Sequence, residues 1–526
     1  MPNGAELLIT ALADAGVEVC FANPGTSEMQ LVAAIDKEPR IHAVLGLFEG
    51  VVTGAADGYG RMADKPALTL LHLGPGFGNG TANLHNAKRA SSPVLNMIGD
   101  HATYHRQYDA PLTSDIEAFA SPVSDWIGSA TSPEELAAIG IEGFQQACRY
   151  PGQVASFIAP ADCAWTDCEA PIPTATVSAV KSATDQAIRS AAERLQAASQ
   201  PVLFLGGRAL REDALYQAGR IAAASGARLV SETFSTRWQR GAGRVTVERL
   251  PYFGEQAAEH LAGTDQMVIV GSKAPVSFFA YPGKPSVLTP ESCHIDTLAD
   301  VHTDALDCLT RLADALGAPE TIEVASKAPT QALESGPLSM VELGKVMANR
   351  LPEQAIVSDE GATNGLGVFL FTEAAAPHDW LMLTGGAIGQ GLPVAVGAAM
   401  ACPNRKVIAL QADGSAMYTP QALWTIAREQ LDVTVVLLNN RSYAILNIEM
   451  DRVGAQAGAK ARSLLDLSNP EIDWVGLANS LGVSAERVTT TEAFDKAFAA
   501  AMNSRGPHLI EAILPGIPSS AGQNLG

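Results

Sequence analysis

Two apolar segments near the C-terminus each end in a short polar sequence, and their spacing sharply limits the possible folds. The first, Lys406 to Leu410, runs into Ala412-Asp413-Gly414-Ser415, and the second, Val433 to Leu438, ends at Asn439-Asn440. Tyr418 to Leu431 lies between them with apolar residues at helical spacing, which predicts a βαβ unit with parallel strands. Both polar ends then lie at the same edge of the sheet.

A carboxylate and an amide at neighbouring strand ends form an oxygen-rich site that suits Mg²⁺, and Gly414 lets a phosphate approach closely. An isolated Asp-Gly-Ser is more often a turn or the start of a helix. Because Asn439-Asn440 follows the next strand, the pair instead favours a site for a metal ion and a diphosphate.

The chain has 526 residues, enough for roughly three domains of about 150 residues each. Hydrophobic residues make up 47% and charged residues 17%, which favours a protein that buries surface between subunits, so we expect an oligomer. The net charge of −21, without a basic run, argues against nucleic-acid binding. The seven cysteines form no Cys-x-x-Cys, so neither a disulfide framework nor a zinc site is predicted.

The N-terminal residues lack a basic segment followed by an apolar stretch, and no run of about eighteen apolar residues occurs. We therefore predict a cytoplasmic protein without a membrane segment. Short β-rich runs alternate with helical patterns along the whole chain, which is typical of the α/β class.

Proline-rich stretches at 171–174 and 318–338 read as linkers. The predicted organisation is three doubly wound domains with mainly parallel sheets, at 1–170, 186–320 and 339–515, followed by a C-terminal tail at 516–526. In the middle domain, the strand Pro201 to Leu205 precedes Gly206-Gly207, which does not make a dinucleotide-binding loop.

Several motifs, taken together, resemble one enzyme family. Asp413-Gly414-Ser415 with Asn439-Asn440 resembles the thiamine diphosphate signature, with Ala412 in place of its first glycine. The run from Phe48-Glu49-Gly50 to Asp57-Gly58-Tyr59-Gly60-Arg61 resembles the segment that carries the activating glutamate of thiamine-diphosphate decarboxylases and acetolactate synthases. The chain is thus identified as a member of the acetolactate synthase and benzoylformate decarboxylase superfamily.

This resemblance implies thiamine diphosphate and Mg²⁺ as cofactors. It also implies a pyrimidine-binding (PYR) first domain, a central domain, and a diphosphate-binding (PP) third domain. The expected assembly is a homo-oligomer, a dimer or a homotetramer, with active sites at the subunit interface.

In the first domain, the resemblance gives Glu49 the role of sharing a proton with the aminopyrimidine ring, although a lone glutamate there would also suit a first helical turn. It places the turn Asn23-Pro24-Gly25 at the cofactor and Thr26 in the substrate pocket, while Ser27 to Gln30 fits a helix capping box. It gives His72, at the end of the strand Ala67 to Leu73, the handling of protons near the substrate. Alternatively, that histidine merely satisfies backbone carbonyls.

In the third domain, the segment Gly385 to Pro393 resembles the one that bends the cofactor, with Ile388 as the apolar wedge and the Gly386 carbonyl accepting the amino group. A glycine-rich helix start packed on a sheet is the alternative. The metal ligands implied are Asp413, Asn440 and the carbonyl of Ser442. The cofactor-binding residues are then Asn23, Pro24, Gly25, Thr363, Gly386, Ile388, Asp413, Gly414, Ser415, Asn440, Ser442 and Tyr443.

The implied reaction acts on 2-oxo acids by decarboxylation through an enamine. Protonation of the enamine releases an aldehyde, as in a lyase, whereas capture of an aldehyde or a second 2-oxo acid gives the product of a carboligase or transferase. We expect an acetolactate synthase-like enzyme. A simple benzoylformate decarboxylase-like enzyme is one alternative, although residues 276–281 lack its second histidine. A noncatalytic cofactor-binding paralogue is another.

One glycine pattern and one histidine pattern predict neither a dinucleotide-binding site nor a metal site. The loop 74–80 fits a dinucleotide fingerprint poorly, which disfavours a nucleotide-dependent oxidoreductase. His101 and His105 have helical spacing without an acidic partner, which predicts a pocket rim or the surface and not a metal site.

Overall fold

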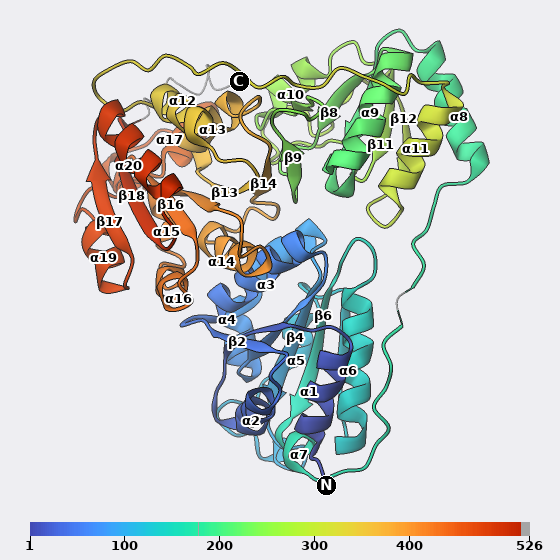
Figure 1. The fold of residues 1–526 in the computed structure, drawn as a ribbon, viewed down its shortest axis with the longest axis vertical. Helices are drawn as coiled ribbons and strands as arrows, with labels where there is room; N and C mark the ends of the chain where they lie inside the picture. Colours follow the sequence, from blue (N-terminus) through green and yellow to red (C-terminus); the bar gives the residue numbers. More distant parts are fainter. Residues whose placement is uncertain (177, 517–526) are drawn as a thin grey trace.

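The computed structural model describes residues 1–176 and 178–516, so most of the predicted C-terminal tail lies outside the described residues. Three sheets, each flanked by helices, occupy three lobes of the molecule (Figure 1). All strand pairs but one are parallel, which confirms the predicted α/β class with three mainly parallel sheets. The exact domain boundaries given above stay a prediction.

The first sheet has six parallel strands in the order β2-β1-β3-β4-β6-β5. They are β1 (Val19–Asn23), β2 (His42–Leu45), β3 (Ala67–Leu71), β4 (Val94–Asp100), β5 (Trp126–Ser129) and β6 (Val154–Pro160). The helices are α1 (Gly4–Asp14), α2 (Met29–Lys37), α3 (Glu49–Ala63), α4 (Leu73–Ala90), α5 (Ile116–Ala120), α6 (Pro133–Ala147) and α7 (Ala161–Trp165). The central strands β3, β4 and β6 are buried along their whole length, as parallel strands covered on both faces must be.

The second sheet has five parallel strands in the order β10-β8-β7-β11-β12. They are β7 (Pro201–Leu205), β8 (Arg228–Ser231), β10 (Glu248–Arg249), β11 (Gln266–Val270) and β12 (His294–Ala299). Its helices are α8 (Asp185–Ala197), α9 (Glu212–Ser225), α10 (Gly254–His260) and α11 (Ala305–Ala315). After β7, the Gly207 N–H donates to the half-buried Glu232 carboxylate (3.1 Å), so a protein carboxylate lies at this turn.

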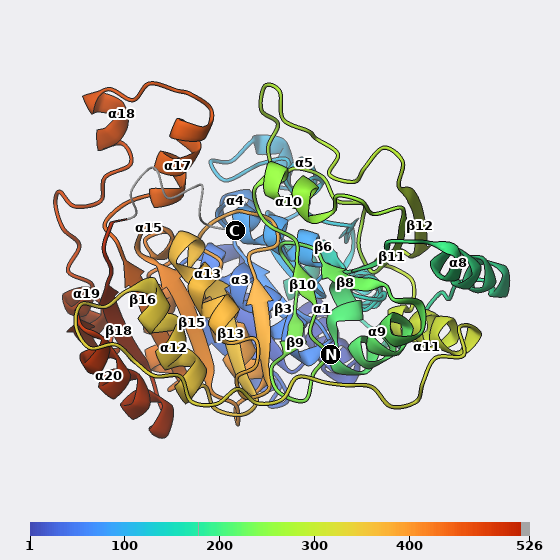
Figure 2. The same ribbon diagram turned by 90° about the horizontal axis from the view of Figure 1, so that it is seen from above.

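The third sheet has the order β17-β18-β16-β15-β13-β14-β9. Its strands are β13 (Ala355–Glu360), β14 (His378–Met382), β15 (Val407–Ala412), β16 (Val433–Asn439), β17 (Ser484–Val488), β18 (His508–Ile513) and the antiparallel β9 (Trp238–Arg240). Its helices are α12 (Met340–Arg350), α13 (Ala362–Phe371), α14 (Gly391–Ala401), α15 (Asp413–Ala416), α16 (Ala422–Arg428), α17 (Ala444–Arg452), α18 (Ala459–Ser463), α19 (Trp474–Ser480) and α20 (Thr491–Asn503). Figure 2 shows α17 and α18 near the top of the view, beyond one end of the strands of this sheet, and α20 near the bottom.

Strand β9 comes from the central part of the sequence, so the middle segment and the third sheet are joined by backbone pairing. The register pairs Trp238 with Trp380 and Arg240 with His378. The predicted linkers carry no helix or strand over the described residues 171–176 and 321–335.

Two local predictions were wrong. The glycine-rich segment 74–80 is not a loop but the beginning of α4, because its glycines let that helix lie against its neighbours; a side chain at Gly80 would lie 2.7 Å from Thr53. The helix predicted over Tyr418 to Leu431 is shorter, because Pro420 cannot continue a helix from the preceding turn, and α16 begins only at Ala422.

Helices α3 and α14 form the closest contact between the first and third lobes. Their apolar side chains share one buried cluster with those of α16. A Cβ atom at Gly397 would lie 1.8 Å from the Ala55 carbonyl oxygen, and one at Gly58 would lie 2.1 Å from the Val394 carbonyl oxygen. Only glycine therefore allows the two helices to approach this closely.

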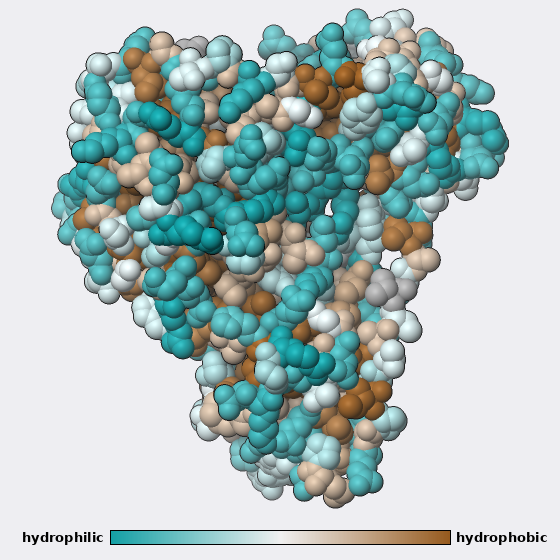
Figure 3. Space-filling view, viewed as in Figure 1, coloured by the Kyte–Doolittle hydropathy of each residue, from teal (hydrophilic) through white to brown (hydrophobic). Residues whose placement is uncertain are grey.

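Within the described residues, no helix is both long and apolar enough to cross a membrane. The face seen in Figure 3 is mainly hydrophilic, with apolar residues scattered over it.

We predict that Gly397→Ala lowers the free energy of unfolding by about 2–3 kcal/mol, because the added methyl group overpacks the contact between α3 and α14. The matched control is Gly78→Ala, on an exposed position of α4 with no atom within 4 Å of the added methyl. There, the higher helix propensity of alanine should raise stability by up to about 1 kcal/mol. Denaturant unfolding of both variants checks this, and equal effects would refute the packing argument.

Candidate active site

The two strands that were predicted to pair in parallel and to end in polar residues, β15 and β16, do pair in parallel. Ala412 at the end of β15 lies opposite Leu438 in β16, so Asp413 and Asn439-Asn440 emerge at the same edge. The Asp413 carboxylate accepts the N–H groups of Gly414 (2.9 Å) and Arg441 (2.7 Å). It thereby joins the two strand ends directly.

The two asparagines have different partners. The Asn439 side chain donates to the buried Glu511 (2.7 Å), and its oxygen accepts the Arg441 N–H (3.1 Å). The Asn440 side-chain oxygen accepts the Ser442 N–H (3.0 Å), which places it beside the Asp413 segment. Both polar atoms of the Asn439 side chain thus have protein partners, whereas the contact of Asn440 involves its side-chain oxygen.

The buried Asp413 lacks a cationic partner. Within the described chain, its hydrogen bonds come from backbone N–H groups, and no lysine or arginine forms an ion pair with it. Burial raises the pKa of this carboxyl to about 6. A buried carboxylate without a counter-charge fits a site completed by a cation, and the accompanying amide and carbonyl oxygens fit Mg²⁺.

One or two carboxylates are typical where phosphate oxygens complete the coordination of Mg²⁺, so the single Asp413 suffices. No group of three or more His, Cys, Asp or Glu residues that could hold a metal occurs among the described residues. The site therefore fits a metal that arrives with a diphosphate and not one held by the protein alone.

Gly414 leaves space that a side chain would fill. A Cβ atom there would lie 2.4 Å from the Tyr443 ring, which covers this turn. The Ser415 hydroxyl already donates to the Ala412 carbonyl (3.1 Å) and accepts from Gln411 (2.6 Å). Thr363, the second residue of α13, is half-buried.

The segment before α14 is held by Glu360, whose role the sequence did not reveal. Its buried carboxylate accepts the N–H groups of Gly389 (2.7 Å) and Gly391 (2.8 Å) and the Gln411 side chain (2.8 Å). Burial raises its pKa. A carboxylate that ends a strand near a glycine-rich helix start was the available signal.

This anchoring shapes the loop that contains Gly386 and Ile388. Gly386 and Gly389 both adopt positive φ angles of 75° and 96°, which a side chain would disfavour. Ile388 between them is half-buried. The helix-start alternative holds for the last three residues of the segment, Gly391 to Pro393, which begin α14, whereas Gly385 to Gln390 precede the helix.

In the first lobe, Glu49 and His72 lie on either side of Gly76. A Cβ atom at Gly76 would lie 3.1 Å from a Glu49 carboxylate oxygen and 3.2 Å from the His72 Cβ. Glu49 begins α3 and accepts a hydrogen bond from Asn79 (3.0 Å). The turn Asn23-Pro24-Gly25 closes on the same place, since a Cβ atom at Gly25 would lie 2.2 Å from His72 Nδ1.

His72 is paired with Glu28, which sequence reasoning also missed. Glu28 Oε2 lies 2.8 Å from His72 Nδ1 and accepts the Gly25 N–H (2.7 Å). The carboxylate favours the tautomer with hydrogen on Nδ1, which leaves Nε2 to act on a substrate. The predicted capping box from Ser27 to Gln30 was wrong, because Ser27 donates instead to Glu28 (2.7 Å). Thr26 is exposed beside this group.

Two asparagines of α4 connect the first lobe to the loop before α14. Asn83 donates to the carbonyls of Gly50 (2.7 Å) and Gly389 (3.3 Å), and Asn86 donates to that of Ala387 (2.7 Å). Within the described residues, however, the hydrogen bonds of Glu49 and His72 share no residue with those of Asp413.

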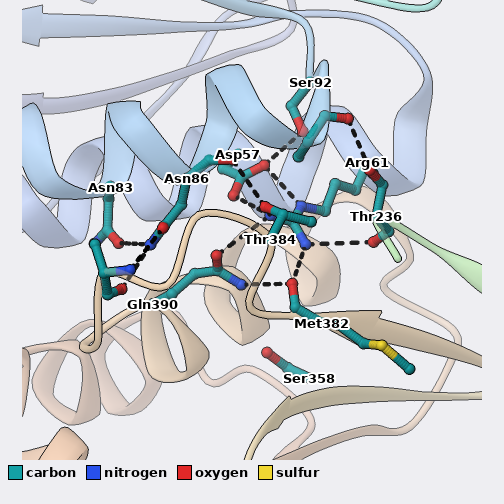
Figure 4. Close-up of polar contacts among 12 residues, drawn as sticks. Asp57, Arg61, Asn83, Asn86, Ser92, Thr236, Ser358, Met382, Thr384 and Gln390 are labelled. Atoms are coloured by element: carbon teal, nitrogen blue, oxygen red, sulfur yellow. Dashed lines mark hydrogen bonds and ion pairs between the residues drawn. The ribbon is translucent and has the colours of Figure 1, made fainter. Parts of the chain in front are cut away.

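A buried ion pair holds the same interface (Figure 4). Arg61 and Asp57 have fully buried side chains and form two hydrogen bonds, of 2.8 and 2.7 Å. Arg61 also donates to the Met382 carbonyl (2.7 Å) and to the Thr384 hydroxyl (3.1 Å), while Ser92 donates to Asp57 (2.5 Å). The end of α3 is thus tied to the start of the Gly386 loop.

His101 and His105 lie near each other, with ring centroids 5.5 Å apart, and His105 also contacts the exposed Tyr108. The structure does not bring them to the groups around Glu49 or Asp413 that are described above.

Comparisons with known proteins agree with these motifs. Residues 2–120 match the N-terminal TPP binding domain of thiamine pyrophosphate enzymes, and residues 363–512 match the C-terminal TPP binding domain. The chain is 50% identical to a Mycobacterium tuberculosis protein provisionally named acetolactate synthase large subunit, over 98% of this chain and 99% of that protein. It is 26% identical to benzoylformate decarboxylase of Pseudomonas aeruginosa, over 94% and 96% of the two chains.

Among solved structures, the Rhodococcus jostii thiamine diphosphate-dependent 4-hydroxybenzoylformate decarboxylase superimposes with a TM-score of 0.86 at 25% identity. The match covers 98% of this chain and 99% of that chain. The chain therefore belongs to the thiamine pyrophosphate enzyme family. Its relatives are acetolactate synthases and 2-oxo acid decarboxylases, and like them it is a thiamine-diphosphate-dependent enzyme.

We predict that Arg61→Ala destabilises the protein by about 3–5 kcal/mol, because it leaves Asp57 buried without its counter-charge. Arg40→Ala, which removes a surface arginine paired with Asp14 and Glu38, is the control and should barely move the denaturation midpoint. Chemical denaturation measures both, and similar midpoints for the two variants would contradict the role given to Arg61.

Proposed function

We propose that this protein is a Mg²⁺- and thiamine diphosphate-dependent enzyme that decarboxylates a 2-oxo acid, with or without ligation of the product to a second carbonyl compound, in the manner of acetolactate synthase. The observation that carries the proposal is the buried Asp413, which has backbone partners and no cation at the meeting point of two parallel strand ends. The sequence similarity to acetolactate synthases and 2-oxo acid decarboxylases supports the same reaction class.

In this proposal, Asp413, Asn440 and the Ser442 carbonyl hold Mg²⁺, and the N–H groups of the turn at Gly414 and Ser415 face the diphosphate. Thr363 and Tyr443 lie at the same edge. Gly386 and Ile388 bind the middle of the cofactor, and the turn Asn23-Pro24-Gly25 approaches it from the first lobe. When bound, thiamine diphosphate supplies a carbon nucleophile and an electron sink.

The protein supplies the protons. Glu49 holds a proton at the aminopyrimidine end, where it is nine-tenths buried and supported by Asn79. His72, oriented by Glu28, presents Nε2 to the substrate and moves a proton there. Exposed Thr26 contacts the substrate from the neighbouring turn.

We further propose that the active site forms between subunits of a homo-oligomer, a dimer or tetramer, with Glu49 of one subunit facing Asp413 of another. The separate hydrogen-bond networks of the two residues support this arrangement. Large apolar side chains exposed near each half-site, Leu47 (45%) and Tyr418 (54%), support it as well. A reduced cytoplasmic setting is supported by the seven cysteines, all free; burial raises the pKa of the Cys20 thiol to about 12.

A simple decarboxylase is the second candidate, and the Glu28–His72 pair favours it, because a positioned proton donor beside the substrate releases an aldehyde without a second carbonyl compound. Retention of Glu49 and Asp413 disfavours a noncatalytic paralogue.

A panel of 2-oxo acids tests the proposed function. Purified protein with thiamine diphosphate and Mg²⁺ should release CO₂ from at least one member of the panel, and addition of an acceptor aldehyde distinguishes ligation from simple aldehyde release. Glu49→Gln should retain cofactor binding but slow the exchange of the thiazolium C2 proton by at least about 100-fold. Inactivity across the panel would overturn the proposal, and unchanged exchange would remove Glu49 from the mechanism.

Asp413→Asn should separate stability from binding. Ionised Asp413 destabilises the apoprotein above its raised pKa of about 6, and this cost fades as pH falls towards the ordinary pKa of an aspartate. The variant should therefore be more stable than wild type at pH 8, on the order of 1 kcal/mol, with a smaller gain at pH 5.

The same variant should lose Mg²⁺-dependent binding of thiamine diphosphate, measured by calorimetry. Destabilisation at pH 8 together with unchanged cofactor affinity would show that Asp413 is an ordinary structural carboxylate.

A further inference from the structure

A segment of the central part of the chain reaches the loop proposed to hold the cofactor. Phe278 Cζ lies 3.1 Å from the position that a Gly386 Cβ would take. Phe278 and its neighbour Phe279 are large apolar residues with 46% and 53% of their surface exposed. They therefore form an open apolar surface beside Gly386, which we call the aromatic wall.

Other aromatic side chains hold the aromatic wall in place. The Phe278 ring packs against Phe234 and Tyr252, each with a centroid distance of 5.5 Å, and against Phe279 at 4.9 Å. Tilted and edge-to-face contacts of this kind stabilise aromatic clusters beyond their buried area. Phe278 is thus supported from behind while its outer face stays free.

The wall is also anchored to the helix that follows the proposed metal site. The Tyr281 hydroxyl donates to Glu449 on α17 (2.7 Å). On the same helix, Arg452 donates to Glu255 (2.8 Å), and its guanidinium lies 3.9 Å from the centre of the Phe253 ring. These contacts fix the wall relative to both Gly386 and the segment carrying Asn440 and Ser442.

The charges around the wall neutralise one another. Arg452 pairs with Glu255 and Glu449, and Lys284 also pairs with Glu255 (3.6 Å). Among the described residues that line the cleft between the wall and α17, each charged side chain thus has an opposite partner. Neither a second carboxylate nor a cationic side chain of a substrate would find a free counter-charge here.

We propose that Phe278 and Phe279 line the substrate side-chain pocket and select uncharged 2-oxo acids with a bulky apolar group, such as a phenyl ring. This inference rests on the proposed decarboxylation of a 2-oxo acid, because it places the substrate at the Gly386 loop, and it favours the simple decarboxylase over the acetolactate synthase-like enzyme. Pyruvate, whose side chain is a single methyl group, would leave the aromatic surface uncovered by substrate. Acidic and guanidino 2-oxo acids would bury an unpaired charge.

The test compares wild type with Phe278→Ala and Phe278→Leu, using phenylglyoxylate, pyruvate, 2-oxoglutarate and 2-oxo-5-guanidinopentanoate. Wild type should show a kcat/KM at least about 10-fold higher for phenylglyoxylate than for the other three. Phe278→Ala should lower kcat/KM for phenylglyoxylate by about 10–100-fold and for pyruvate by less than about 3-fold. Phe278→Leu should recover part of the loss, because it restores apolar volume.

Leu306→Ala is the matched control, an exposed apolar residue elsewhere in the central part of the chain, and it should change neither substrate's kcat/KM. Unfolding midpoints of all variants check that they are folded. A second readout does not need turnover: calorimetry of the cofactor-loaded protein with the unreactive 2-hydroxy acids mandelate and lactate. Mandelate should bind at least about 10-fold more tightly than lactate, and Phe278→Ala should remove the difference.

The outcomes separate the two proposals. Mandelate selectivity that depends on Phe278, with no turnover of any 2-oxo acid, would support the pocket and refute the proposed function. Turnover that favours pyruvate or a charged 2-oxo acid would refute the pocket and leave the proposed function in place. Equal effects of Phe278→Ala on both substrates, or equal binding of mandelate and lactate to wild type, would also refute it.

Discussion

The contact between α3 and α14 is the constraint on which the rest of the structure depends. Glycines at 58 and 397 bring the two helices together, and the buried pair of Asp57 and Arg61 ties the end of α3 to the loop before α14. Glu49 begins α3, and Gly386 lies in that loop, so one interface fixes both segments relative to each other within a subunit. Glycine is required at both positions because a Cβ atom would collide with a backbone carbonyl oxygen of the other helix.

Two buried carboxylates near that interface illustrate different physical solutions to the same problem. Glu360 is satisfied internally, by three N–H groups of residues 389–391 and by Gln411. Among the described residues, Asp413 accepts the backbone N–H groups of Gly414 and Arg441 and forms no ion pair with a lysine or arginine. Glu360 therefore orders the protein around the site, whereas Asp413 leaves a negative charge that a bound ion can use. The contacts of Glu360 suit a structural role, and those of Asp413 suit a ligand-binding role.

The sequence predicted the sheets and the position of Asp413 well, because both follow from local rules: buried parallel strands are apolar, and their carboxyl ends share an edge. It missed Glu28, whose partner His72 is 44 residues away, and the bonds from Arg61 to Thr384 and Gln390, more than 300 residues apart. Such pairings depend on how segments far apart in the sequence pack together, which no periodicity encodes. The glycines of 74–80 misled for the same reason, since they serve helix packing and not a loop.

Strand β9 has a consequence for any attempt to divide the chain. It covers β14, whose residues 378–380 would otherwise form the open border of the third sheet. Arg240, next to the turn out of β9, also stacks over Phe369 at 3.7 Å. A fragment beginning after the second linker would expose unsatisfied backbone groups along β14, a template for intermolecular strand addition. The edge of the third sheet at β14 is therefore covered only when the central part of the chain, which carries β9, is present.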